Sequence, residues 1–311
     1  MSLTRALTRF LIVIAASFST ACTQLSFFVA NAPTIVGPFK RVANLQYGTT
    51  ARQQLDIYAP TNAAKRPVVV FWYGGAWTEG DKDSYRFVGA ALAERGFVAV
   101  LPDYRLAPAI KFPDFLNDGA HAVAWVQENI AQYGGDPERV VLMGHSAGAH
   151  IAAFLALNDS YLKHAGGRPE WIRGLIGLSG PYALVPNTVS LNTIFAAPYT
   201  TRDWQPVKFV TPHAPPTLLF HGLDDGLVLP SHAEELRDAL QAAGVPVQAE
   251  FFQGRGHADT VAAIAWAARN RGPVLEDSTK FIERVTSSSA RTSLPASVTS
   301  QRRSSQNGPL R

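Results

Sequence analysis

The sequence predicts an α/β fold with a mostly parallel, eight-stranded sheet flanked by helices on both sides. Short apolar, β-rich runs alternate with helical segments along the chain, which is typical of such a sheet. Several runs, Val68–Trp72 among them, are apolar without alternation, as strands buried on both faces are. The chain has 311 residues, 47% of them hydrophobic, and this suffices for one large domain with a well-buried core.

Eight strands are expected from these runs. They cover Val42–Tyr47, Leu55–Tyr58, Val68–Trp72, Phe97–Leu101, Val140–Met143, Gly174–Leu178, Thr217–His221 and Val247–Phe252. Helical spacing of apolar residues follows Pro113 and recurs over Ala147–Leu157 and Asp277–Val285. Ser231 and Glu234 have the spacing of a capping box, so we expect Ser231 to open a helix that Gly244 ends.

The N-terminus, residues 1–22, has the form of an export signal. Arg5 and Arg9 precede an apolar stretch, and small residues lead to Cys22, the single cysteine of the chain. The stretch resembles a bacterial lipoprotein signal, in which Cys22 would carry the lipid, although Ser19 stands where Leu is usual. A plain secretory signal cut after Ala21 and an uncleaved anchor are the alternatives. We expect an exported protein, periplasmic, lipid-anchored or secreted.

The rest of the chain divides into a catalytic domain over residues 42–285 and a tail over 286–311. The tail is dominated by Ser, Thr, Arg and Pro, and its composition predicts disorder. Residues 180–216 interrupt the strand–helix rhythm with many prolines and aromatics. Because a long irregular insertion in a compact domain is more often functional than idle, we interpret this segment as a small cap over the sheet.

A nucleophile is predicted at Ser146. It lies in the pentapeptide Gly144–Gly148, which matches G-x-S-x-G, between a predicted strand and a predicted helix. A serine on that sharp turn exposes its hydroxyl at the edge of the sheet, and the flanking glycines allow the turn to pack. The amide of Ala147, directly after the serine, is then placed to stabilise an oxyanion.

Serine needs a base and an acid, which in this arrangement come from loops after later strands. The strand Thr217–His221 leads to Asp224 and Asp225. Asp225 is the preferred acid because it precedes Gly-Leu-Val, and this segment resembles the HGxxDxxV loop of α/β-hydrolases. The strand Val247–Phe252 leads to His257, the expected base. The other histidines are interpreted as structural; His221, for example, ends a buried strand.

A second part of the oxyanion site is expected after the strand Val68–Trp72. The sequence Tyr73-Gly-Gly-Ala-Trp77 resembles the HGGGW loop of carboxylesterases, with Tyr73 in place of His and Ala76 in place of the third Gly. The donors in such a loop are backbone amides, so Gly75 and Ala76 can still supply them. The replacement of His leaves open how the loop is held.

With these motifs, residues 46–285 resemble the α/β-hydrolase superfamily. Within it they are similar to the bacterial feruloyl-esterase-like (BD-FAE) carboxylesterases and their relatives near the hormone-sensitive-lipase and kynurenine-formamidase groups. The resemblance also rests on Leu55–Pro60, Tyr73–Lys82 and Asp103–Pro108. It implies hydrolysis of carboxylic esters through an acyl-enzyme, without a cofactor. A formamidase, amide or thioester hydrolase with the same triad, or a non-catalytic binding protein on this scaffold, are the alternatives.

The expected partner is a small ester with a short acyl chain or a small aromatic group. Candidate pocket residues are Trp77, Phe195, Tyr199 and Trp204, although they could equally pack on one another. The net charge of +4 comes partly from the two ends, and no basic run suggests a nucleic-acid surface. No metal-ligand spacing is present, a membrane is expected only through the N-terminus, and the oligomeric state is left open.

Overall fold

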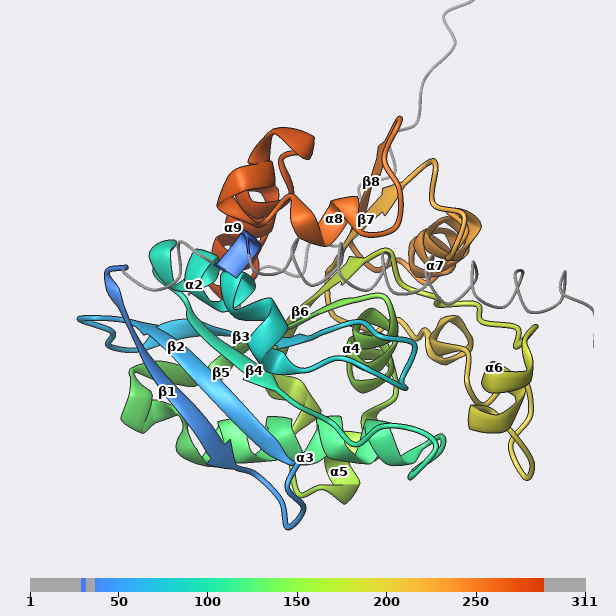
Figure 1. The fold of residues 1–311 in the computed structure, drawn as a ribbon, viewed down its shortest axis with the longest axis horizontal. Helices are drawn as coiled ribbons and strands as arrows, with labels where there is room; N and C mark the ends of the chain where they lie inside the picture. Colours follow the sequence, from blue (N-terminus) through green and yellow to red (C-terminus); the bar gives the residue numbers. More distant parts are fainter. Residues whose placement is uncertain (1–28, 32–36, 288–311) are drawn as a thin grey trace, which may run out of the picture.

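The computed structural model describes residues 29–31 and 37–287, and its centre is one eight-stranded sheet (Figure 1). The strand order is β1-β2-β4-β3-β5-β6-β7-β8. Strand β2 runs antiparallel to β1 and to β4, and all other neighbours are parallel, which confirms the predicted sheet. The strands are β1 (Phe39–Gln46), β2 (Gln54–Pro60), β3 (Arg66–Trp72), β4 (Val98–Pro102), β5 (Gly135–His145), β6 (Ile172–Leu178), β7 (Thr217–Gly222) and β8 (Val247–Phe252).

All eight predicted strands are present, and their ends differ by a few residues. The largest difference is in β5, which begins at Gly135 instead of Val140. The added residues, from Gly135 to Arg139, are mostly polar and only partly buried, so hydrophobicity does not reveal them. They extend the strand because Gly135 pairs with Arg66 at the start of β3.

Helices cover both faces of the sheet (Figure 1). Helices α2 and α9 pack together on one face, and α3, α4 and α5 pack together on the other. The α-helices are α2 (Arg86–Glu94), α3 (Asp114–Asn129), α4 (Ala147–Leu157), α5 (Asp159–His164), α6 (Val189–Ile194), α7 (Ser231–Ala242), α8 (Asp259–Ala262) and α9 (Val274–Thr286). Short 3-10 helices are η2 (Lys82–Tyr85), η3 (Ile130–Tyr133), η4 (Pro169–Trp171), η5 (Pro206–Phe209) and η6 (Trp266–Arg271).

The start of α7 corrects one prediction. Its N-cap is Pro230, Ser231 is the first helical residue, and no side chain caps the helix, so the expected capping box does not form. The amide of Glu234 donates to the carbonyl oxygen of Pro230 at 3.1 Å. Because Pro230 already has helical backbone angles, the helix begins one residue early and Ser231 no longer occupies the capping position.

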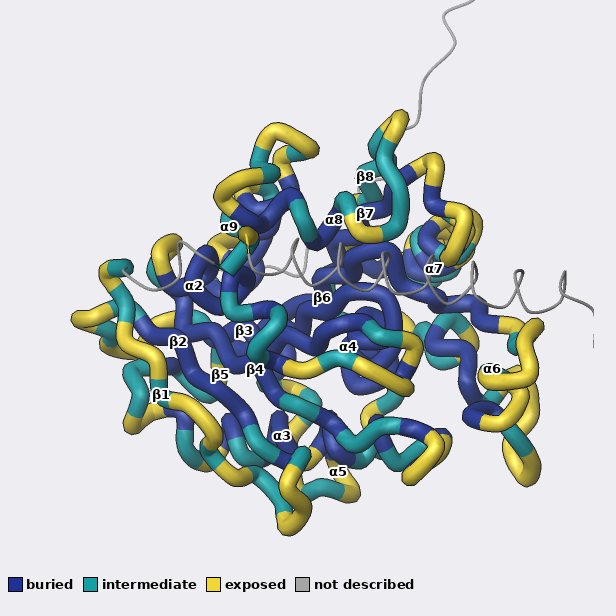
Figure 2. The backbone as a smooth tube through the Cα atoms, in the orientation of Figure 1, coloured by how far each residue is buried: buried dark blue, intermediate teal, exposed yellow. Residues whose placement is uncertain are grey.

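The core lies along the central strands, whose backbone is buried in Figure 2. Val68, Val69 and Val70 of β3 are fully buried, which fits a strand with helices on both faces. Each such side chain contributes about 1.5–3 kcal/mol when it leaves water. The carboxyl ends of these strands are thereby held rigidly, and the predicted catalytic loops follow them.

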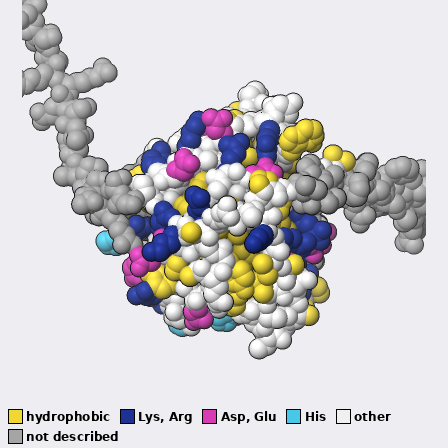
Figure 3. Space-filling view, turned by 90° about the vertical axis from the view of Figure 1, so that its left-hand side faces the viewer, with side chains coloured by type: hydrophobic (Ala, Val, Ile, Leu, Met, Phe, Trp, Pro, Cys, Tyr) yellow, Lys and Arg dark blue, Asp and Glu magenta, His cyan; other side chains and the backbone are white. Residues whose placement is uncertain are grey.

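The surface carries charges of both signs, which are scattered over the face shown in Figure 3. Within the described ranges, the helices are too short or too polar to cross a membrane. The predicted export signal with Cys22 lies outside the described residues, as does the tail from residue 288. Residues 180–216, the predicted cap, hold α6, η5 and the loops that join them.

Candidate active site

Ser146 lies on a sharp turn between the end of β5 and the start of α4. Its backbone angles are φ 54° and ψ −122°, in a region that costs a non-glycine residue about 1–3 kcal/mol. Gly144 and Gly148 make the turn possible. A Cβ atom on Gly148 would overlap the carbonyl group of Trp72, and one on Gly144 would overlap the backbone of Gly148. The strand–turn–helix context predicted for the pentapeptide is therefore present.

The structure brings Ser146, His257 and Asp225 together in one chain of hydrogen bonds. Oγ of Ser146 lies 2.9 Å from Nε2 of His257, and Nδ1 of His257 lies 2.8 Å from Oδ2 of Asp225. The three residues come from the loops after β5, β8 and β7. This is the geometry in which an imidazole can accept the serine proton while a carboxylate orients it.

Asp225, rather than its neighbour Asp224, meets the histidine. Asp225 is buried and its Oδ1 accepts hydrogen bonds from the amides of Leu227 (3.0 Å) and Val228 (2.9 Å), whereas Asp224 is exposed. Burial by itself raises the pKa of Asp225, but hydrogen bonds from His221, His257 and Val228 outweigh it and hold that pKa well below its usual range. The carboxylate therefore stays ionised beside His257.

His221 belongs to the site, although its sequence position suggested only a buried strand end. Its Nε2 lies 2.8 Å from the carbonyl oxygen of Val228 and 3.2 Å from Oδ2 of Asp225. Because a carbonyl oxygen only accepts, Nε2 carries the proton and faces the carboxylate as a donor. The signal that could have found His221 is its place at the end of β7, four residues before Asp225.

His145 joins the serine turn to the loop of the base. Its Nε2 lies 3.2 Å from the carbonyl oxygen of His257, and the two imidazole rings are 5.0 Å apart. Burial, with the neighbouring His257, lowers the pKa of His145 to about 3, so its ring is neutral at ordinary pH. A neutral ring with the proton on Nε2 can donate to that carbonyl group and hold the loop in place.

Three amide groups remain available beside the serine. Between residues 37 and 287, no acceptor takes a hydrogen bond from the backbone N–H of Gly75, Ala76 or Ala147. The loop after β3 touches the nucleophile closely, because a Cβ atom on Gly74 would lie 2.9 Å from Cβ of Ser146. Gly75 has φ +134°, which glycine adopts readily. Free donors near a nucleophile are the requirement of an oxyanion hole.

A cavity of about 610 Å³ opens over Ser146 and His257. The predicted oxyanion residues Gly75 and Ala76 lie in its wall. Aliphatic side chains from the segment around α6 and from the loop after β7 form an apolar side of the cavity: Leu184, Val185, Leu191, Leu227, Val228 and Leu229. Sequence reasoning missed these residues, because isolated aliphatic side chains carry no signal that separates a pocket wall from core.

Of the four predicted pocket residues, only Trp77 lines this cavity. Phe195 packs edge-on against Trp77, with ring centroids 4.8 Å apart, and Trp204 lies 5.8 Å from Phe195. Tyr199 packs edge-on against Phe112 at 5.0 Å. Aromatic contacts with Trp77 and Phe112 thus hold these three residues of the segment 180–216 in a cluster that does not line the cavity, and Tyr199 stays 37% exposed.

In the described part of the chain, no group of three or more His, Cys, Asp or Glu side chains has an arrangement that could hold a metal ion. The cavity is lined by Ser146, His257 and the loop of Gly75 and Ala76, together with further polar side chains, among them Glu79, Asp81, Asn187 and His232. The serine, the histidine and the amides described above suit attack on a carbonyl group and stabilisation of the resulting oxyanion.

Two family models match separate parts of the chain, residues 55–169 and residues 195–289. The BD-FAE model matches residues 55–169, which hold Ser146, Gly75 and Ala76. The model of the prolyl oligopeptidase family matches residues 195–289, which hold Asp225 and His257.

The chain is similar to curated esterases in sequence and to a solved esterase structure in fold. A probable isoprenylcysteine alpha-carbonyl methylesterase of Arabidopsis thaliana is 32% identical over 242 residues, covering 70% of this chain and 50% of that protein. Esterase LipC of Mycobacterium tuberculosis is 30% identical over 219 residues, covering 63% of this chain and 54% of that protein. The chain therefore spans about half the length of these relatives. A truncated carbohydrate esterase from gut microbiota superposes with a TM-score of 0.71 at 20% identity, covering 80% of this chain and 97% of that one.

Proposed function

We propose that this chain, an α/β-hydrolase similar to the BD-FAE carboxylesterases, is a serine carboxylesterase that acts on short-chain or small aromatic esters. The single observation that carries the proposal is the hydrogen-bond chain Ser146–His257–Asp225 at 2.9 and 2.8 Å. The esterase names of its relatives support the reaction class.

In the first half of the reaction, Nε2 of His257 accepts the proton of Ser146 while Oγ attacks the ester carbonyl carbon. The ionised Asp225 stabilises the imidazolium that forms. The amides of Gly75, Ala76 and Ala147 stabilise the oxyanion, and one such donor is typically worth about 10²–10³ in rate. The imidazolium then protonates the leaving alcohol, and an acyl-enzyme on Ser146 remains.

In the second half, water takes the place of the alcohol. His257 accepts a proton from that water as its oxygen attacks the acyl carbonyl carbon, and the same amides stabilise the second oxyanion. Collapse of this intermediate breaks the bond to Oγ, and His257 returns the proton to Ser146. The products are a carboxylic acid and the regenerated serine.

The cavity supports a small substrate. Its volume, about 610 Å³, lies within the range of pockets for small molecules, and its aliphatic side suits an acyl or aryl group. Since Phe195, Tyr199 and Trp204 do not line it, the apolar contacts come from residues such as Leu184, Leu191 and Trp77. We expect acetate and butyrate esters to be hydrolysed faster than long-chain esters.

Amide hydrolysis is the second candidate, favoured by the match of residues 195–289 to the prolyl oligopeptidase family. The same triad can release an amine after the same attack, as a formamidase or peptidase would require. Comparing p-nitroanilides and N-formyl amides with p-nitrophenyl esters separates the two candidates. Higher kcat/KM for an amide than for every ester would replace the esterase proposal.

The site of action proposed for the protein is outside the cytoplasm. The support is the N-terminal pattern with Arg5, Arg9 and Cys22. Expression of the full chain in a bacterium with labelled palmitate tests the lipid anchor, with Cys22→Ser as the control. Label in the wild-type chain that the variant lacks supports a lipoprotein; an unlabelled, processed chain in the periplasm supports a plain signal.

The experiment for the esterase proposal is steady-state hydrolysis of p-nitrophenyl acetate and butyrate by the wild type and by Ser146→Ala. We expect turnover by the wild type and a loss of about 10⁴–10⁶ in kcat for the variant. Equal rates in both proteins would contradict the proposal. A folded wild type that is inert toward these esters would favour the amide-hydrolase or binding-protein alternatives.

A further inference from the structure

The loop of residues 74–81, which we call the oxyanion loop, has a strained backbone. Ala76 (φ 48°) and Trp77 (φ 60°) adopt left-handed conformations that side chains disfavour. Inside the loop, the amides of Thr78 and Glu79 both donate to the carbonyl oxygen of Gly75, at 2.9 and 3.0 Å. Such a conformation persists only when surrounding groups hold it, so the contacts at the ends of the loop matter.

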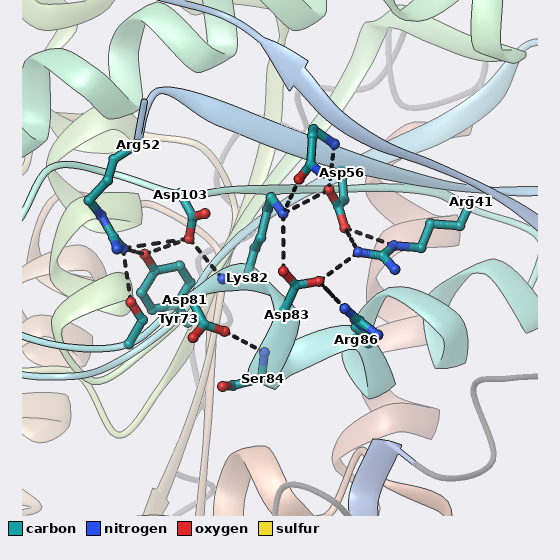
Figure 4. A network of polar contacts seen from close by, with 12 residues as sticks. Arg41, Arg52, Asp56, Tyr73, Asp81, Lys82, Asp83, Ser84, Arg86 and Asp103 are labelled. Carbon is teal, nitrogen blue, oxygen red and sulfur yellow. Dashed lines mark hydrogen bonds and ion pairs between the residues drawn. The ribbon is translucent and has the colours of Figure 1, made fainter. Parts of the chain in front are cut away.

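Asp103, just after β4, joins the two ends of the oxyanion loop through one oxygen atom (Figure 4). Its Oδ1 accepts a hydrogen bond from the hydroxyl of Tyr73 at 2.8 Å and another from the amide of Lys82, also at 2.8 Å. Tyr73 directly precedes the loop and Lys82 directly follows it. A change in the position of Asp103 would therefore move both ends.

Arg52, in the turn between β1 and β2, makes a second bridge over the same loop (Figure 4). Its Nη2 donates to the hydroxyl of Tyr73 at 2.6 Å and to the carbonyl oxygen of Gly80 at 2.8 Å. Its Nε donates to the carbonyl oxygen of Tyr104 at 2.8 Å, which fixes the guanidinium plane. Because a guanidinium only donates and a carboxylate only accepts, the Tyr73 hydroxyl accepts from Arg52 and donates to Asp103.

The ring of Tyr73 is fixed as firmly as its hydroxyl. It is fully buried and stacks on Tyr104 with centroids 4.8 Å apart and on Tyr85 at 5.7 Å. The hydroxyl of Tyr104 donates to the carbonyl oxygen of Tyr73 at 3.1 Å. Tyr73 thus stands where related loops carry His, and its hydroxyl reaches partners that lie on two other segments of the chain.

We propose that Tyr73, Asp103 and Arg52 are positioning residues that clamp both ends of the oxyanion loop and so aim the amides of Gly75 and Ala76 at the reacting carbonyl oxygen. The catalytic part of this inference rests on the proposed esterase function. The clamp acts through the loop, because the three side chains bind the loop and not the substrate. It supplies the anchor that the replacement of His by Tyr73 left open.

The first test is Tyr73→Phe, which keeps the stacked ring and removes only the hydroxyl. We expect kcat for p-nitrophenyl butyrate to fall by about 10–100-fold, while KM changes by less than about 3-fold. The fall in kcat should stay below the upper limit of about 10³ that the loss of a whole oxyanion donor costs, because Tyr73→Phe leaves the donors in place. Inhibition by a trifluoromethyl ketone, whose tetrahedral adduct places an oxyanion in the same site, should weaken by the same factor as kcat/KM.

The matched control is Tyr58→Phe. Tyr58 is also almost fully buried, but its hydroxyl has no hydrogen-bond partner in the part of the chain that is described. We expect its kcat and its inhibition constant to match those of the wild type. An equal loss in both variants, or an unchanged kcat in Tyr73→Phe, would overturn the clamp.

Arg52→Gln is a second variant, chosen because the Arg52 side chain is 35% exposed and the protein should fold without it. We expect the same pattern, with lower kcat, weaker ketone inhibition and nearly constant KM. Arg66→Gln, which removes an exposed arginine without a side-chain partner among the described residues, is the control for lost charge. Urea unfolding of all four variants measures their free energy of unfolding and shows whether kcat falls only where stability falls. If kcat falls only in destabilised variants, the loss comes from instability and the positioning role is contradicted.

Hydrogen exchange separates failure of the clamp from failure of the esterase function. If the wild type hydrolyses no ester, the proposed function fails. The clamp still predicts that residues 74–81 are protected from amide hydrogen exchange. Amide exchange there should be at least about tenfold faster in Tyr73→Phe than in Tyr58→Phe, because a released loop opens more often. Equal exchange rates in the two variants would contradict the clamp whatever the activity.

Discussion

Nε2 of His221 lies 3.2 Å from Oδ2 of Asp225, the same oxygen that lies 2.8 Å from Nδ1 of His257. Both side chains, His221 and Asp225, are fully buried, so the contact is not screened by water. The carboxylate is therefore held from two sides, with the amides of Leu227 and Val228 on its other oxygen. Its orientation toward His257 depends on His221 as well as on its own loop.

This relationship predicts that His221→Phe lowers kcat for p-nitrophenyl butyrate by about 10–150-fold, because a hydrogen bond to a charged group is worth about 1.5–3 kcal/mol. His221→Gln retains an N–H donor and should lie within about threefold of the wild type. Steady-state kinetics of the two variants check the prediction. If both variants lose activity equally, His221 acts by filling space and not by donating to Asp225.

A glycine pair tests the serine turn. Gly148→Ala places a methyl group on the carbonyl group of Trp72, and we expect it to lower the free energy of unfolding by at least about 1–3 kcal/mol. Gly226→Ala, next to Asp225, is the control, because no atom lies within 4 Å of its Cβ position. Urea unfolding at constant pH measures both. Equal stability of the two variants would show that the backbone around Ser146 is looser than this packing implies.

The buried His150 predicts a loss of stability in acid. Burial lowers its pKa to about 3, although Nε2 contacts the carbonyl oxygen of Trp204 at 2.9 Å. An unfolded histidine titrates near 6.5, so between about pH 6.5 and 3 the unfolded chain binds the extra proton and the folded protein loses stability as pH falls. Over this range His150 lowers the free energy of unfolding by about 1.4 kcal/mol for each pH unit of acidification.

The measurement for His150 is urea unfolding of the wild type and of His150→Gln at several pH values between 6 and 4.5. The variant keeps an amide donor for the carbonyl group of Trp204 and has no imidazole to protonate. As pH falls, the free energy of unfolding of the variant should decrease less steeply than that of the wild type. The difference between the two slopes should be about 1.4 kcal/mol per pH unit. Parallel slopes in the two proteins would mean that His150 is protonated in the folded state.

The cavity predicts a change of chain-length preference when its wall is filled. Leu191 of α6 lines the cavity, and Leu191→Trp should lower kcat/KM for p-nitrophenyl butyrate relative to acetate by about tenfold, the scale of one or two methylene groups. Val189, on the same helix, is 86% exposed and does not line the cavity, so Val189→Trp is the control. A preference unchanged by Leu191→Trp would place the acyl group elsewhere.

The fold could be predicted from the sequence because buried parallel strands are continuous apolar runs. The runs over Val68–Trp72 and Val140–Met143 mark strands that are present, and the architecture of the superposed esterase agrees. The predicted element boundaries were wrong where contacts with neighbouring segments, and not the local sequence pattern, determine the structure. The polar start of β5 depends on pairing with β3, and the cap of α7 depends on the backbone angles of Pro230.

The candidate site could be predicted only where a motif carries the chemistry. Ser146, Asp225 and His257 follow from strand ends and spacing, and the structure brings them together. Tertiary contacts such as those from Arg52 to Tyr73 join segments far apart in the chain, and no local pattern encodes them. The residues of the cavity wall could not be predicted for the same reason. Whether an aromatic residue such as Phe195 packs inward or lines a pocket depends on its tertiary neighbours.

The most direct test of the central claim, that Ser146 is the nucleophile, is covalent labelling by a fluorophosphonate with the adduct located by peptide mass spectrometry. The displaced fluoride leaves and Oγ of the activated serine forms the bond to phosphorus. The proposed triad predicts one adduct per chain on the peptide with Ser146, none in Ser146→Ala, and much slower labelling in His257→Ala. No adduct on the folded wild type, or an adduct on another residue, would contradict the assignment of Ser146.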